Sequence, residues 1–108
     1  MSEYLFDRQK WAALSIFEQM GNIGSEVGRA LRAKAKSDNV SMEAAFYRGL
    51  DLLDATAEAW VNGKSHRVVE ILRARELFVQ SIVTHQVDPM LEDYFMQFAM
   101  AARIRQFA

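Results

Sequence analysis

The scarcity of chain-breaking residues most constrains how this chain can fold. Its 108 residues include one proline and five glycines, so turn signals are few and far apart. Few breaks leave room for a small number of long elements, which favours helices over a sheet of many short strands. The length suits one domain, which we place over residues 1–108. The sequence therefore predicts an all-α domain.

Polar and apolar residues alternate at helical spacing and divide the chain into four expected helices. We place the first from residue 4 or 7 to residue 36, and the second from a Ser41 cap to the Asn62-Gly63 stop. The third covers residues 65–84, and the fourth runs from Asp88-Pro89 to residue 106. The links are short, which makes consecutive helices antiparallel. We therefore expect an antiparallel up-down-up-down four-helix bundle.

Four glycines lie within these expected helices. If the first helix ends near residue 36 and the second begins near residue 41, residues at equal height have numbers that sum to about 77, so Gly28 faces Gly49. Each glycine costs about 1 kcal/mol of helix propensity, and close approach of two backbones would compensate for that cost. We therefore interpret all four as helix-packing residues: Gly21, Gly24, Gly28 and Gly49.

The amino-acid composition argues against several classes of function. The chain has no cysteine, which removes disulfides, thiolate nucleophiles and cysteine-ligated metals. Glu3 and Asp7 lie in the N-terminal segment, so it does not resemble a signal peptide, and no apolar run is long enough to cross a membrane. The net charge of −1 argues against a basic nucleic-acid-binding surface that covers the whole domain. We expect a cytoplasmic protein with no membrane association.

Residues that could support catalysis or bind a metal are scattered. No inward Glu-x-x-His repeat is present, His66 lies on a polar side, and His85 lies near a helix end. One row of carboxylates admits a cation site, although a solvated helix face is the better interpretation: Asp51, Asp54 and Glu58. We therefore expect a non-enzymatic protein with no catalytic residue, cofactor or metal.

Arg75 and Glu76 fall on the apolar side of the third expected helix. Buried charges are usually paired, so the two residues would form a buried polar network within the core or at an oligomer interface. The alternative is that both flank the apolar stripe, with their aliphatic stems along it and their charged ends in water.

Basic residues crowd the end of the first expected helix: Arg29, Arg32, Lys34 and Lys36. Cations at a helix C-terminus oppose the negative end of the helix dipole. Such a cluster also meets the requirement for contact with nucleic-acid phosphates. Both interpretations remain open from the sequence.

Residues 22–29, Asn-Ile-Gly-Ser-Glu-Val-Gly-Arg, resemble the helix motif of the 23S rRNA intervening-sequence proteins. That motif is Asn-Ile-Ala-Glu-Gly followed by a small residue and a basic one. The matching residues include Asn22, Ile23, Gly28 and Arg29, while the acidic residue is displaced by one position to Glu26.

A second short match follows at Arg48-Gly49, which resembles the Arg-Gly-Ser step of that family and has an acidic residue close behind at Asp54. The chain is also similar to small uncharacterised bacterial helical-bundle proteins that share the Asn-Ile-Gly-Ser-Glu stretch. The first resemblance implies a four-helix bundle that forms cyclic pentamers and for which nucleic-acid binding is suspected.

The fourth expected helix carries two apolar stripes. We assign one to the core: Leu91, Tyr94, Phe95, Phe98 and Ala102. The other gathers on nearly the opposite side and is interrupted by Asp93 and Arg103: Met96, Met100, Ile104 and Phe107. A surface helix of a monomer needs one such stripe, and methionine-rich surfaces adapt well to partners.

The second stripe leads us to expect a homo-oligomer, in which a dimer is the commonest outcome. The alternatives are a different protein partner, or a C-terminal end that frays or folds back onto Trp11 and Phe6. The sequence thus predicts a self-associating helical interaction protein. The alternative function is RNA or DNA binding of the intervening-sequence type.

Overall fold

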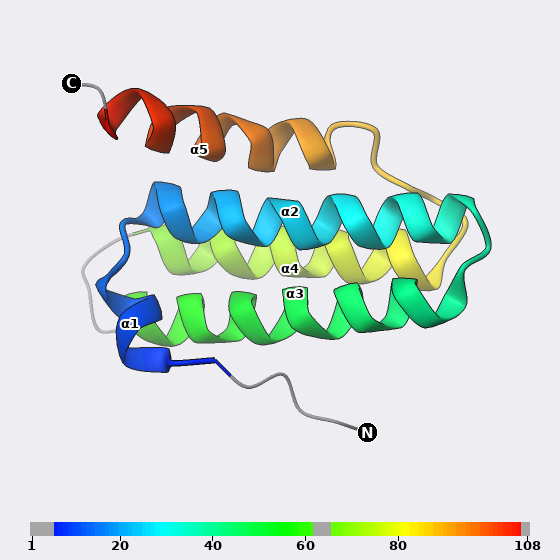
Figure 1. Cartoon of the computed structure of the whole chain (residues 1–108), viewed down its shortest axis with the longest axis horizontal. Helices are drawn as coiled ribbons and strands as arrows, with labels where there is room; N and C mark the ends of the chain where they lie inside the picture. Colours follow the sequence, from blue (N-terminus) through cyan, green and yellow to red (C-terminus); the bar gives the residue numbers. More distant parts are fainter. Residues whose placement is uncertain (1–5, 62–65, 107–108) are drawn as a thin grey trace.

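The computed structural model describes residues 6–61 and 66–106, and these residues form five helices and no strand. They are α1 (Arg8–Ala13), α2 (Ile16–Ala35), α3 (Asn39–Trp60), α4 (Arg67–Val83) and α5 (Leu91–Gln106) (Figure 1). The expected all-α class is confirmed, whereas the expected count of four helices is wrong. The Asn62-Gly63 stop signal and Phe107 lie outside the described residues.

The first expected helix is divided in two at Leu14 and Ser15. Leu14 is extended, with a ψ of 154°, and Ser15 begins α2 with a capping box. The Ser15 hydroxyl accepts from the Glu18 amide at 3.1 Å, and the Glu18 carboxylate accepts from the Ser15 amide at 3.3 Å. This reciprocal pair satisfies N–H groups that a helix start leaves unpaired, so a new helix begins where the residues suggested a continuous one.

Asp38, rather than the expected Ser41, caps the start of α3. Ser37 ends the preceding turn with a positive φ of 58°. The Ser41 amide then donates to the Asp38 carboxylate at 3.1 Å. Hydrogen bonding with Ser41 lowers the pKa of Asp38 below its usual value, because it favours the ionised carboxylate.

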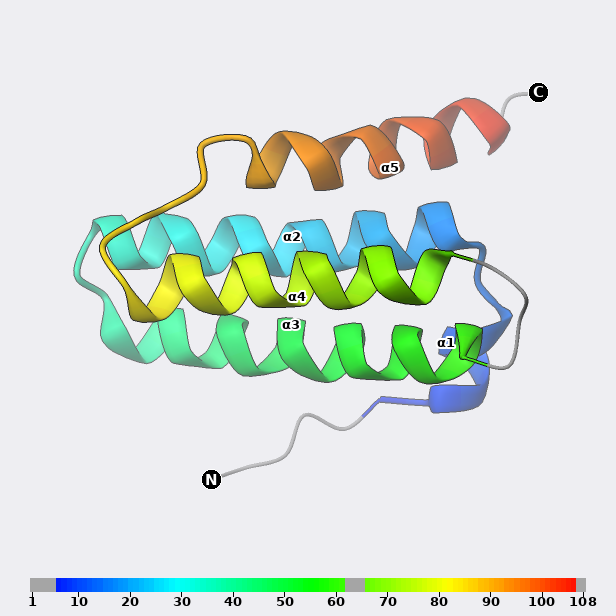
Figure 2. The same ribbon diagram turned by 180° about the vertical axis from the view of Figure 1, so that it is seen from behind.

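Helix α2 is the centre of the arrangement. It packs against α3, α4 and α5, while α1 packs against α3. Helices α2, α3 and α4 lie side by side, and α5 runs along α2 on the side away from α3 (Figures 1 and 2). The largest side chains that are almost fully buried form the core: Phe78, Phe95, Met20, Ile23, Leu53, Ile71 and Leu91.

Glycines allow close helix contacts at three of the four expected positions. A Cβ at Gly24 would lie 2.6 Å from the Cβ of Phe95, and one at Gly21 would lie 3.0 Å from the Cα of Ala99. Both contacts bring α5 onto the backbone of α2. A Cβ at Gly49 of α3 would lie 2.8 Å from the Phe78 ring of α4.

The expected contact between Gly28 and Gly49 is wrong. The nearest atom to a Cβ at Gly28 would be a guanidinium nitrogen of Arg32, at 2.9 Å, on the same helix. A Cβ at Gly49 would instead meet Phe78 and, at 3.6 Å, the Cβ of Glu26. Equal height along two helices does not by itself bring two residues into contact. Gly28 lies on the side of α2 that faces α5.

Replacement of these glycines by alanine tests this packing. Gly24→Ala should lower the free energy of unfolding by about 1–3 kcal/mol, because its methyl group overlaps Phe95. Gly28→Ala is the matched control, since the flexible end of Arg32 can move aside and alanine gains up to about 1 kcal/mol of helix propensity. Thermal unfolding followed by circular dichroism measures both. Equal loss of stability in the two variants would contradict the packing described.

Candidate functional site

The outward side of α5 carries the apolar stripe predicted from the sequence. Met96, Met100 and Ile104 are 56%, 58% and 68% exposed, whereas Leu91 and Phe95 on the opposite side are buried. The fourth predicted member, Phe107, lies outside the described residues. We call the three described residues the α5 outer face.

The inward side of α5 is held by neighbouring helices. The Phe98 ring packs against Phe17 of α2, with a centroid distance of 6.4 Å, and the Arg105 guanidinium lies 4.9 Å from the Phe17 centroid. The Tyr94 hydroxyl donates to the Glu70 carboxylate of α4 at 3.1 Å. Burial of Tyr94, together with the charge of Glu70, raises the pKa of this phenol, so Tyr94 remains a neutral donor.

The alternative in which the C-terminal turns fold onto Phe6 and Trp11 does not describe residues 91–106. The Trp11 indole instead donates to the Thr56 hydroxyl of α3 at 2.8 Å, and Phe6 packs edge-on against Trp11. The last turns of α5 lie against Phe17 of α2. The α5 outer face therefore stays uncovered by the described part of the chain.

A second exposed apolar stripe, on α4, was missed by sequence reasoning. Val69, Leu72 and Val83 are 70%, 49% and 67% exposed, and Val79 is half-buried. The apolar spacing of the third expected helix predicts that Leu72 and Val79 face the core, which is wrong for Leu72. Glu76 lies at the centre of this stripe and is exposed. Helical spacing identified residues that share a face, but it did not identify which face the neighbouring helices cover.

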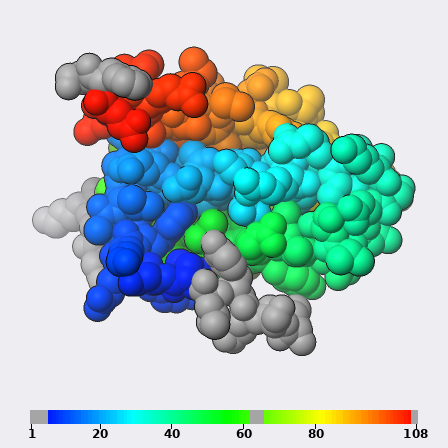
Figure 3. Space-filling view, in the orientation of Figure 1, coloured from blue at the N-terminus to red at the C-terminus, as the bar shows by residue number. Residues whose placement is uncertain are grey.

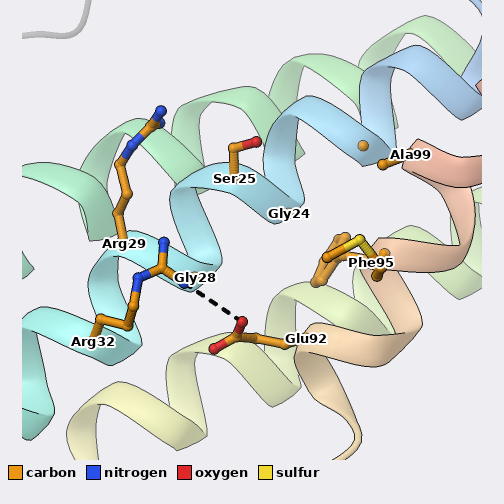
Figure 4. A pocket seen from close by; sticks show the side chains of 10 residues that line it. Gly24, Ser25, Gly28, Arg29, Arg32, Glu92, Phe95 and Ala99 are labelled. Atoms are coloured by element: carbon orange, nitrogen blue, oxygen red, sulfur yellow. Dashed lines mark ion pairs between the residues drawn. The ribbon is translucent and has the colours of Figure 1, made fainter. Parts of the chain in front are cut away.

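A groove runs between α2 and α5 beside the α5 outer face. The three glycines of α2 and Ala99 form its floor, and one hollow of about 260 Å³ lies over Gly24 and Gly28 (Figure 4). A second hollow of about 280 Å³ shares Gly21, Ser25 and Ala99 with the first and extends toward Arg103. In the space-filling view, α5 lies directly against α2 along this line (Figure 3).

Charged side chains close the groove at its Gly28 end. Arg32 of α2 and Glu92 of α5 point toward each other, with a nitrogen–oxygen distance of 3.7 Å (Figure 4). Arg29 pairs with Glu26 at 2.8 Å. Two of the four basic residues assigned to phosphate contact are therefore paired with carboxylates, although the side chains of Arg29 and Arg32 are 56% and 62% exposed.

The third basic residue, Lys34, leaves this surface altogether. Its ammonium group donates to the backbone carbonyls of Ser81, at 2.6 Å, and of Thr84. These carbonyls belong to the end of α4, where unpaired C=O groups and the helix dipole both favour a cation. Lys36 is exposed near Asp38. The four basic residues that are close in the sequence therefore have three different environments: Arg29 and Arg32 pair with carboxylates, Lys34 binds the end of α4, and Lys36 is exposed.

Glu26 joins α2 to α3. It is 8% exposed, and its second carboxylate oxygen accepts from Arg48 at 3.0 Å. Its side chain also borders Gly49. The two short matches to the intervening-sequence motif therefore meet in space at this pair. The sequence feature that could have identified this pair is the position of Glu26, an acidic residue, on the apolar side of its helix. The resemblance did not predict that Glu26 binds Arg48.

Arg75 and Glu76 do not form the possible buried polar network; their charged ends meet solvent, as in the alternative interpretation. Arg75 is half-buried and pairs with Asp54 of α3 at 2.8 Å, and both partners face solvent in part. Glu76 is exposed. Glu76 lies on the outer side of α4, whereas Arg75 lies at the edge of the side that carries the buried Ile71, Ala74 and Phe78, from which it reaches α3.

A buried polar network exists instead around Gln19, which is fully buried. The Gln19 amide donates to the Trp11 carbonyl at 2.9 Å and accepts from the Trp60 indole at 2.8 Å. Thr56 accepts from the Trp11 indole and donates to the Leu52 carbonyl at 2.7 Å. The network ties α1 to α2 and α3. Every polar group in it has a partner within the chain, which indicates a structural role.

The described residues show neither a metal site nor a helix suited to span a membrane. Among residues 6–61 and 66–106, no group of three histidine, aspartate or glutamate side chains is placed to hold a metal ion. In the carboxylate row, Asp54 pairs with Arg75 and Glu58 pairs with Arg8 at 3.1 Å. In the described part of the chain, no helix has both the length and the apolarity that a membrane span requires.

Lys34→Met should lower the free energy of unfolding by about 1–2 kcal/mol, because it removes a charged donor from the end carbonyls of α4. Lys36→Met, a matched loss of charge at an exposed position, should change it by less than about 0.5 kcal/mol. Urea unfolding measures both. Equal effects would show that Lys34 contributes only to overall charge.

Comparison with known proteins leaves the family open. No protein-family model matches the chain, and no curated protein or solved structure shows significant similarity to it. The resemblance at residues 22–29 and 48–49 therefore stays a prediction. The geometry of α2, α4 and α5 carries the functional argument.

Proposed function

We propose that this chain is a non-enzymatic helical interaction protein that self-associates through the α5 outer face. The observation that carries the proposal is the exposure of Met96, Met100 and Ile104 on the side of α5 opposite its buried residues. Apolar side chains aligned along one helix lose unfavourable water contact when a partner covers them. Methionine adapts its shape to the partner surface, which suits such a contact.

The proposal is supported by how firmly α5 is held. Gly21 and Gly24 admit α5 close to α2, and Tyr94 ties it to Glu70 of α4. The orientation of α5 about its own axis is therefore set before any partner arrives. A partner would meet a preorganised surface, and preorganisation reduces the entropic cost of association.

The expected result for the wild-type chain is an oligomeric mass in light scattering at micromolar concentration. Met100→Glu should yield a monomeric mass, because a charge at the centre of the apolar face opposes its burial. Met90→Glu is the matched control, since Met90 is 63% exposed and precedes α5. A wild-type monomer would refute the proposal.

Leu72→Glu separates the α5 outer face from the stripe on α4. We expect it to leave the oligomeric mass unchanged, because Leu72 lies on a different helix and outside the proposed contact. If Leu72→Glu dissociates the protein while Met100→Glu does not, the contact lies on α4 and the assignment to α5 is wrong.

The alternative function is RNA or DNA binding. The partial exposure of Arg29 and Arg32 beside the groove favours it, but Glu26 and Glu92 compensate their charges and Lys34 is engaged with α4. We therefore expect the protein to pass through a heparin column at low salt. Salt-dependent retention that is abolished by Arg29→Glu combined with Arg32→Glu would favour the alternative.

A further inference from the structure

Two opposite charges flank Met96 and Met100 of the α5 outer face. Asp93, Met96, Met100 and Arg103 follow one another at spacings of three, four and three, which places them in a single line along the helix. Asp93 and Arg103 are both exposed. Among the residues that the structure describes, neither forms an ion pair, in contrast to Glu92 and Arg32 nearby. The line thus reads acidic, apolar, apolar, basic.

We infer that two copies of this chain pair their α5 helices antiparallel about a two-fold axis, with Asp93 against Arg103 of the partner subunit and Met96 against Met100 of the partner subunit. The inference rests on the proposed function. A two-fold axis makes each contact occur twice, so this register yields two methionine contacts and two ion pairs. Its centre falls between Gln97 and Ala99, near the middle of α5.

The charge pattern distinguishes this arrangement from others. A parallel pair of α5 helices would set Asp93 against Asp93 and Arg103 against Arg103. The stripe on α4 has Glu76 at its centre, so two antiparallel copies of α4 would bring two Glu76 carboxylates together. Like charges that face each other across an interface oppose association, whereas the antiparallel α5 pair is self-complementary.

Charge exchange tests the pairing. Asp93→Arg and Arg103→Asp should each raise the dimer dissociation constant at least about tenfold, since each creates two like-charge contacts. The double variant Asp93→Arg/Arg103→Asp restores opposite charges and should return within about threefold of the wild-type value. Sedimentation equilibrium measures all four proteins. Failure of the double variant to recover affinity would overturn the antiparallel pairing.

Two controls separate this result from other effects. Arg105→Asp also reverses a charge in the last turn of α5, but Arg105 lies over Phe17 and away from the line, so the dissociation constant should stay close to the wild-type value. Circular dichroism of each variant verifies that α5 remains folded, because the exchanged charges oppose its dipole. A wild-type monomer would refute self-association itself, whereas a wild-type dimer that is insensitive to single exchanges would refute only this pairing.

Engineered cysteines test the register, since the chain has none of its own. Under mild oxidation, an equimolar mixture of Met96→Cys and Met100→Cys should form a mixed disulfide dimer faster than either variant alone. Faster dimerisation of Met100→Cys alone would place Met100 on the two-fold axis. That outcome would overturn the pairing of Asp93 with Arg103.

Discussion

The close approach of α5 to α2 depends on the absence of side chains at Gly21 and Gly24. Ala99 and Phe95 occupy the space that two Cβ atoms would otherwise fill. With Phe95 buried against α2, the geometry of a helix places Met96 and Met100 toward solvent. The candidate interaction surface is therefore a consequence of glycine packing on the far side of the same helix.

Charges along α2 serve mainly to join helices. Glu26 binds Arg48 of α3, Arg32 reaches Glu92 of α5, and Lys34 meets the end carbonyls of α4. Opposite charges and carbonyl oxygens compensate most of the basic cluster, so a run of cations in the sequence does not become a continuous basic surface. This arrangement leaves fewer uncompensated cations for contact with phosphates.

Some features of the fold and of the candidate site could be predicted from the sequence, and others could not. The stripe on α5 followed from spacing within one helix, because residues three and four apart share a side. The break before α2 was missed, although Ser15 and Glu18 have the spacing of a capping box. The roles of Gln19 and Glu26 could not be predicted, because their partners lie on α1 and α3, far along the chain.

The sequence by itself determined the all-helical class, the approximate limits of α3, α4 and α5, the end of α2 and the residues that share each helix face. These properties depend on local hydrogen bonds and on spacing within one segment. Only the tertiary structure decided that Gly28 does not contact Gly49, that Leu72 is exposed and that Lys34 caps the end of α4. Those outcomes depend on how each helix is rotated against its neighbours, and the packing of the whole core determines that rotation.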